Sequence, residues 1–224
     1  MPPPGICAEY GYMLLIPENA SIFAEHATSM QKRTFNSSDY ATFFPERGKE
    51  LMLREIELYP ESAPNTVNSF IWAAKEKMYK DRLIKRIVPG FVLQPSYCYF
   101  DDKRCDYMLE GEFESNGIKN PVKFEKWTVA MAGDGDKEAH GCEFFITLTD
   151  ETGRKLAGKF AAFGKVIDGF EEVTRLENVP LVQVYPEGVG AVIKQPVEDE
   201  YMLDIEVETF GIEYPQPEIK YWVK

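Results

Sequence analysis

Residues 85–94 read Lys85-Arg86-Ile87-Val88-Pro89-Gly90-Phe91-Val92-Leu93-Gln94, two short apolar runs separated by a Pro-Gly pair. Proline lacks the N–H that a sheet ladder needs and glycine has no side chain to pack, so the pair predicts a bulge or sharp bend. Strict alternation would put Arg86 and Phe91 on opposite faces of the strand. An irregularity at the Pro-Gly pair can bring both to one face, a cationic donor beside an apolar wall. The simpler interpretation is a solvated arginine next to an ordinary turn.

Alternating segments on both sides of this stretch predict further strands. Tyr40 to Phe44 and Leu51 to Leu58 flank the turn at 45–48 and predict a hairpin. The other expected strands are Ile84–Val88, Phe91–Leu93, Thr128–Ala132, Glu143–Leu148, Ala161–Val166 and Met202–Phe210.

Two of these strands predict which side chains face the core. In Glu143–Leu148, the neighbours Phe144 and Phe145 must point to opposite faces, so we expect one in the core and the other exposed. In the last strand, one face carries Leu203, Ile205, Val207 and Thr209 and the other carries Asp204, Glu206 and Glu208. This strand is therefore expected to have one wet face.

Helical periodicity is confined to a few segments. Ser62 is expected to cap a helix with Pro64 in its first turn, and its apolar stripe is formed by Val67, Phe70, Ile71, Ala74 and Met78. A short second core helix is expected from Phe170 to Leu176, and Ser21 to Met30 has helix-compatible spacing.

About eight strands with two core helices cannot form a doubly wound sheet, which needs a helix between nearly every pair of strands. The sequence therefore predicts a mainly β fold, a closed eight-stranded antiparallel barrel capped by two α-helices. Side chains fill the interior of such a small barrel, so a ligand site is expected on the outer wall or in loops.

Composition narrows the class of partner and the location. The 224 residues contain 25 Lys and Arg against 37 Asp and Glu, and the net charge of −12 repels nucleic acid and anionic membranes. The longest apolar run, Met13 to Ile16, is far too short to span a bilayer, and no basic segment precedes it as in a secretory leader. We therefore expect a cytoplasmic protein without a nucleic-acid or membrane partner. We also expect a monomer. It should have an N-terminal extension over 1–37, one domain over 38–217 and a tail over 218–224.

Metal and disulfide chemistry find little support in the sequence. The four cysteines (Cys7, Cys98, Cys105 and Cys142) form no CxxC pair, so we expect reduced thiols. Asp134, Asp136 and Glu138 suggest a calcium loop, but the twelfth position from Asp134 is Phe145, which cannot supply the bidentate carboxylate. No metal site is expected.

Several segments in this order resemble the cyclophilin family of peptidyl-prolyl isomerases, most closely its bacterial members. They are residues 57–70, Arg86-Ile87-Val88-Pro89-Gly90-Phe91, Gly111-Glu112-Phe113, Phe144-Phe145-Ile146 and Ala161-Ala162-Phe163-Gly164-Lys165-Val166. The resemblance covers roughly Tyr40 to Pro217 and implies an eight-stranded barrel capped by two helices. It also implies isomerisation of X-Pro bonds in flexible or unfolded polypeptides, without a cofactor.

The resemblance assigns roles to individual residues. Arg86 matches the catalytic arginine, Gln94 would bind the substrate backbone, and Val92 replaces a methionine in the proline pocket. Phe91, Phe145 and Leu156 would wall that pocket. Ala132, Glu143 and Phe160 match the remaining substrate-binding positions.

Departures from the family pattern surround these positions. Pro95-Ser96-Tyr97 replaces Gly-Gly-Asp, and a bulky charged loop over 99–108 replaces a glycine-rich one. Cys142 and Glu143 replace serine and glutamine, so an anion stands where the family offers an amide, and Glu143 could pair with Arg86. We therefore weigh an active isomerase against a peptide-binding module with weak or absent turnover. A third possibility is that residues 10–16 fold back and occlude the pocket.

Overall fold

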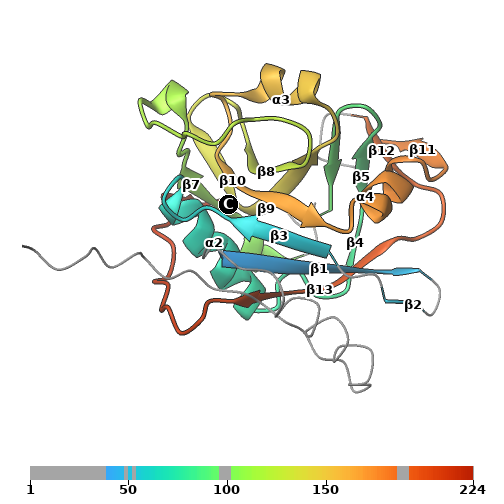
Figure 1. The fold of residues 1–224 in the computed structure, drawn as a ribbon, viewed down its shortest axis with the longest axis horizontal. Helices are drawn as coiled ribbons and strands as arrows, with labels where there is room; N and C mark the ends of the chain where they lie inside the picture. The colour runs from blue at the N-terminus through green and yellow to red at the C-terminus, as the bar shows by residue number, and fades with distance from the viewer. Residues whose placement is uncertain (1–38, 48–49, 52–53, 96–101, 186–191, 224) are drawn as a thin grey trace, which may run out of the picture.

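A computed structural model describes residues 39–47, 50–51, 54–95, 102–185 and 192–223 (Figure 1). Its strands are β1 (Asp39–Arg47), β2 (Glu50–Leu51), β3 (Arg54–Leu58), β4 (Arg82–Leu83), β5 (Arg86–Val88), β6 (Val92–Gln94), β7 (Tyr107–Glu110), β8 (Thr128–Gly133), β9 (Glu138–Thr147), β10 (Ala162–Asp168), β11 (Leu181–Val184), β12 (Ile193–Pro196), β13 (Tyr201–Glu208) and β14 (Tyr221–Trp222). Its helices are α2 (Pro64–Lys75), α3 (Asp150–Leu156) and α4 (Phe170–Glu177), with short 3-10 turns η1 (Lys103–Cys105) and η2 (Glu114–Asn116). The expected helical stretch Ser21–Met30, Cys7 and Cys98 lie outside the described residues.

One sheet of twelve antiparallel strands curves around the core, in the order β14-β7-β9-β8-β10-β3-β1-β13-β4. Strand β6 also pairs with β9 and carries β5 on its other side, while β11 and β12 form a separate pair. A mainly β fold is therefore confirmed. Among the described residues no ladder joins the ends of this sheet, so the predicted hydrogen-bonded closure of an eight-stranded barrel is not observed.

The fold also contains strands that the sequence analysis did not predict, because they are short. Strands β4, β7, β11, β12 and β14 contain only two to four residues each, too few for an alternating pattern to be read from the sequence. Strand β13 contains a bulge. Its register with β1 shifts between Phe44 and Pro45, which pair with Asp204 and Met202, so a single alternating pattern does not run through the whole strand.

The expected apolar stripe of α2 is confirmed and forms much of the core. Val67, Phe70, Ile71 and Ala74 are buried, as is Met78 just after the helix. The Phe70 ring lies 5.4 Å from the Tyr79 and Phe144 rings and 5.1 Å from the Phe163 ring, centroid to centroid. Burial of one such aromatic side chain contributes about 1.5–3 kcal/mol, so this cluster fixes α2 against the sheet.

The start of α2 is capped from a distant segment, not by Ser62 as expected. Ala63 occupies the N-cap and makes no side-chain cap bond. The buried Glu112 carboxylate instead accepts from the backbone N–H groups of Asn65 (3.0 Å) and Thr66 (2.7 Å), and from the Thr66 hydroxyl (2.7 Å). A carboxylate suits this position because the free N–H groups of a helix start carry partial positive charge.

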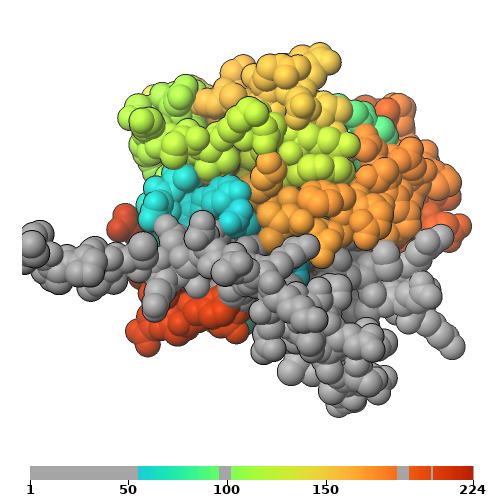
Figure 2. All heavy atoms as spheres, in the orientation of Figure 1, coloured from blue at the N-terminus to red at the C-terminus, as the bar shows by residue number. Residues whose placement is uncertain are grey.

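The expected helix at Phe170–Leu176 is present as α4, but α3 was not predicted from the sequence. Its seven residues, DETGRKL, have no apolar stripe, and only Thr152 and Gly153 are buried. A Cβ at Gly153 would lie 2.6 Å from the Phe124 carbonyl oxygen, so glycine permits the close approach of α3 to that segment. In Figure 2, α3 (yellow) lies above the green segment that follows β7. None of the described helices is long and apolar enough to cross a membrane.

The remote cap predicts a large stability effect at one carboxylate. Glu112→Gln should lower the free energy of unfolding by about 1–3 kcal/mol, because buried donors lose a charged acceptor. Urea unfolding checks this value, with Glu114→Gln as the control, since Glu114 is exposed two residues away. Equal losses in the two variants would contradict the cap.

His140 in β9 predicts the direction of a pH effect. Burial lowers the pKa of His140, and the carboxylates of Asp134 and Glu138 offset this only in part. The unfolded state therefore binds a proton more readily, and stability should fall as the pH drops below the ordinary histidine value near 6.5. His140→Gln should therefore flatten the pH dependence of the free energy of unfolding, measured with urea, between pH 7 and 5. Unchanged pH dependence in His140→Gln would refute this assignment.

Candidate active site

Strands β5 and β6 form an antiparallel hairpin whose tip is the Pro89-Gly90 turn. The register pairs Arg86 with Gln94, Ile87 with Leu93 and Val88 with Val92. Ile87 and Leu93 belong to the main core. The sharp bend expected at the Pro-Gly pair is therefore a chain reversal between two strands, and the cross-strand pairing brings the Arg86 and Gln94 side chains together.

The hairpin tip is held by both neighbouring helices. Gly90 has a φ of +71°, which favours glycine, and its N–H donates to the Glu177 carboxylate of α4 (2.8 Å). Its carbonyl accepts from the hydroxyls of Thr149 (3.3 Å) and Thr152 (3.1 Å) at the start of α3. Because Thr149 also caps α3, one residue fixes the helix and the hairpin.

A short polar chain links the predicted catalytic residue to β9. The Arg86 guanidinium donates through Nη1 to Gln94 Oε1 (2.7 Å), and Gln94 Nε2 donates to Glu143 Oε2 (3.3 Å). Gln94 and Glu143 are buried, whereas Arg86 is half-buried. The Gln94 amide therefore bridges Arg86 and Glu143, the two charged groups whose pairing was considered from the sequence.

The predicted pocket residues gather in an apolar cluster separate from the main core. Six of the eight predicted substrate-binding residues belong to it, either buried or packed against it: Phe91, Val92, Ala132, Phe145, Leu156 and Phe160. The other two, Gln94 and Glu143, form the polar chain beside it. The structure therefore brings the whole predicted set to one side of the sheet.

Phe145 is the centre of this cluster, and its surroundings correct one expectation. Phe144 is fully buried in the main core, as alternation predicts, but Phe145 is only 5% exposed and not on a wet face. The Phe160 ring meets it edge-on, with centroids 5.3 Å apart. The sequence pattern missed this because the cover over Phe145 comes from residues far along the chain.

Four further residues of the cluster were not identified from the sequence: Val122, Phe124, Ala130 and Ala162. Ala130 and Ala162 are paired across β8 and β10, where small side chains leave room beside the Phe145 ring. The sequence does contain a signal for the two alanines, since they alternate with larger core residues: Val129 and Met131 in β8, and Phe163 in β10.

The loop between β8 and β9 forms one rim of the cluster. Gly135 lies beside Phe160, since a Cβ there would be 3.3 Å from its ring. Asp134 Oδ1 accepts from the backbone N–H groups of Asp136, Lys137 and Glu138 at 2.9–3.0 Å. Burial raises the pKa of Asp134, but these backbone donors outweigh burial and hold that pKa below its usual value. Asp134 therefore closes a turn, and the described residues contain no group of His, Cys, Asp or Glu suited to a metal.

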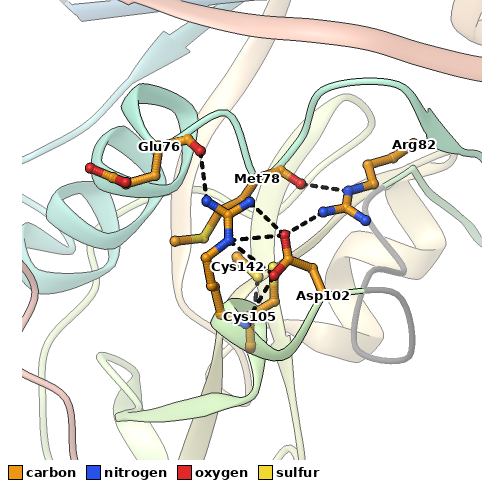
Figure 3. A network of polar contacts seen from close by, with 7 residues as sticks. Glu76, Met78, Arg82, Asp102, Cys105 and Cys142 are labelled. Atoms are coloured by element: carbon orange, nitrogen blue, oxygen red, sulfur yellow. Dashed lines mark hydrogen bonds and ion pairs between the residues drawn. The ribbon is translucent and has the colours of Figure 1, made fainter.

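The described part of the loop expected to be remodelled is held by its own ion pairs (Figure 3). Asp102 Oδ2 accepts from Arg82 (2.5 Å) and from Arg104 (2.7 Å), and Arg104 also donates to the Glu76 carbonyl after α2 (3.1 Å). The guanidinium groups lower the pKa of Asp102, chiefly through the hydrogen bonds from Arg104, although burial opposes them. Residues 102–105 are thereby fixed to the end of α2.

The two described cysteines lie in η1 and in β9, the strand that carries Glu143 and Phe145. Cys105 and Cys142 are both buried, and Cys142 Sγ lies 3.8 Å from the Cys105 carbonyl oxygen, a weak hydrogen bond (Figure 3). This contact ties the residue before Glu143 to η1.

Comparison with known proteins agrees with this geometry. The family model described as cyclophilin type peptidyl-prolyl cis-trans isomerase/CLD matches residues 53–204. Peptidyl-prolyl cis-trans isomerase B of Bacillus subtilis is 34% identical over 137 residues, covering 61% of this chain and 89% of that protein. The isomerase of Acinetobacter baylyi is 32% identical over 132 residues, covering 56% and 67%. A longer relative, cyp15 of Rhizopus delemar, is 28% identical over 123 residues, which cover 55% of this chain and only 19% of that protein.

Solved structures share the fold. A Cryptosporidium parvum cyclophilin superposes with a TM-score of 0.55 at 22% identity, covering 76% of this chain and 97% of that chain. A second crystal structure of it, determined in the presence of the dipeptide Ala-Pro, gives a TM-score of 0.56 at 22% identity and covers 75% and 98%. The family model spans more than half of the 224 residues. The predicted resemblance is thereby confirmed, and the chain belongs to the cyclophilin-type peptidyl-prolyl cis-trans isomerase family.

Proposed function

We propose that the chain isomerises X-Pro bonds at the surface formed by β5, β6 and β9, with Arg86 as the hydrogen-bond donor to the reacting amide. One observation carries this proposal. Arg86 is joined through Gln94 to the same strands that hold Val92 and Phe145, so a cationic donor lies beside an apolar cluster.

The reaction explains why this combination is useful. Rotation about an X-Pro bond breaks amide resonance and faces a barrier of about 20 kcal/mol. In the twisted transition state the proline nitrogen regains a lone pair, and a donor aimed at it stabilises that state more than the planar ones. A guanidinium suits this role because it stays charged and offers several donors in a rigid fork. Gln94 and Glu143 would hold the guanidinium in place through the observed hydrogen-bonded chain.

The apolar cluster would hold the proline ring while the bond turns. Phe145 and Val92 would form the floor, and Phe91, Ala132, Leu156 and Phe160, which are only partly buried, would form the walls. Fixing the ring lets the rest of the peptide rotate against it. A pocket of this kind binds the planar and twisted states about equally, so it should affect substrate affinity more than the rate of the bound complex.

The finer features of this activity are also part of the proposal. Flexible or unfolded polypeptides are the proposed substrates, because their X-Pro bonds are accessible and exchange slowly without a catalyst. A role in protein folding within the cytoplasm is part of the same proposal.

A peptide-binding module with little turnover is the second candidate. It is favoured by the negative charge of Glu143, buried within the polar chain to Arg86. An anion in this position lowers the electrostatic advantage that a guanidinium offers to a developing lone pair. The third possibility, occlusion by residues 10–16, falls outside the described residues.

Arg86 decides between the first two candidates. Arg86→Ala should reduce kcat/KM for a short Ala-Pro peptide by about 100-fold, the usual loss for one transition-state donor. Exchange NMR spectroscopy of the peptide measures this rate even for weak catalysts. Lys85→Ala is the matched control, since it removes the neighbouring cation and should leave the rate within about twofold of wild type.

The control makes each outcome informative. Loss of exchange in Arg86→Ala alone supports the isomerase. Peptide binding by the wild type without any exchange would replace it with the binding module, and equal losses in both variants would point to a general effect of charge.

Phe160 provides a separate test of the proline pocket. Phe160→Ala removes the edge-on partner of Phe145 and should raise KM for the same peptide by about 2- to 12-fold, with little change in kcat. Phe210→Ala, which removes an exposed ring outside the cluster, should change neither constant. A fall in kcat at unchanged KM would contradict the proposed role of Phe160.

A further inference from the structure

The C-terminal segment adds a strand to the sheet beyond the region matched by the family model, which ends at residue 204. Strand β14 pairs with β7, Tyr221 opposite Met108 and Trp222 opposite Tyr107. The Lys220 N–H donates to the Met108 carbonyl and the Val223 N–H to the Asp106 carbonyl, both at 2.8 Å. Residues 220–223, which lie in the tail expected over 218–224, are therefore bonded along the edge of β7, the neighbour of the site strand β9.

Tyr107 connects this added strand to β9. Its ring lies between Trp222 of β14 (centroids 5.3 Å apart) and Trp72 of α2 (5.6 Å), and it is fully buried. The ring also lies against Gly141 of β9, where a Cβ would be 2.0 Å from it. Only glycine leaves space for this contact, so the position of Tyr107 and the path of β9 depend on each other.

The Tyr107 hydroxyl fixes the backbone of β9 as well. It donates to the Gly141 carbonyl (3.1 Å) and lies 2.7 Å from the Ser69 hydroxyl, which also donates to that carbonyl. Gly141 is two residues before Glu143, whose carboxylate accepts from Gln94. A continuous series of contacts therefore leads from Trp222 through Tyr107, Gly141, Glu143 and Gln94 to Arg86.

We propose that Trp222 and Tyr107 are positioning residues for the isomerisation site. Trp222 packs against Tyr107 and holds its ring against β9. The Tyr107 hydroxyl fixes the β9 backbone that carries Glu143. Glu143 in turn orients Gln94 and Arg86 through their hydrogen bonds. This proposal rests on the proposed function. Strand β14, which lies outside the residues matched by the family model, then helps to orient the Arg86 guanidinium.

Two variants test the two links. Tyr107→Phe keeps the ring and removes the hydroxyl, and Trp222→Ala removes a ring that is 50% exposed at the sheet edge and should leave the fold intact. Each should lower kcat for an Ala-Pro peptide by about 3- to 30-fold, the usual range for residues coupled to a site through packed neighbours. Each should also shift the NMR signals of the Gln94 side-chain amide. Trp222→Phe, which keeps an aromatic ring, should restore both properties.

Tyr221→Phe is the matched control on the same strand, because it removes only the hydroxyl that donates to Glu138 (2.5 Å). It should retain wild-type kcat and Gln94 signals. Wild-type kcat and unshifted Gln94 signals in Trp222→Ala and Tyr107→Phe would overturn the proposal, as would an equal loss in Tyr221→Phe. If the wild type catalyses no exchange, the proposed function fails, and the Gln94 signals still decide whether these residues position the site.

Discussion

Strand β9 is buried on both of its faces, and most of the structure depends on this constraint. Phe144 and Ile146 enter the main core, whereas Phe145 enters the second cluster and Glu143 joins the polar chain to Gln94 and Arg86. A strand buried on both sides has no freedom to slip, because a shift of one residue would exchange the two sets of side chains. Its neighbours β6, β7 and β8 are fixed by the same register, so the core and the candidate active site are aligned together.

The site is held by contacts between segments that are far apart in the chain. The tip of the Arg86 hairpin is bonded to α3 through Thr149 and Thr152 and to α4 through Glu177. Beside this tip, Phe91 and Val92 belong to the cluster around Phe145. A catalytic donor must be oriented before the substrate arrives if it is to favour the twisted amide, and a hairpin fixed at its tip and along β9 provides this orientation.

The departures from the family pattern lie where the structure adds polar contacts of its own. Glu143 is buried and accepts from Gln94, so the charge that replaces an amide is satisfied within the protein. In the altered loop, Asp102 is held between Arg82 and Arg104, and Arg104 reaches the end of α2. These ion pairs fix the described part of the charged segment close to the core.

The sequence by itself determined the family, the mainly β class, the apolar stripe of α2, the α4 helix and the residue types gathered around Arg86. These features depend on local periodicity or on collinear motifs, which can be read along the chain. Only the tertiary structure decided that Glu112 caps α2 across more than 40 residues, that polar α3 holds the hairpin tip, that Phe145 is buried and that β14 joins β7. Each of these is a contact between distant segments with no periodic signal of its own. Whether such a side chain is buried or paired depends on which segment the fold brings against it.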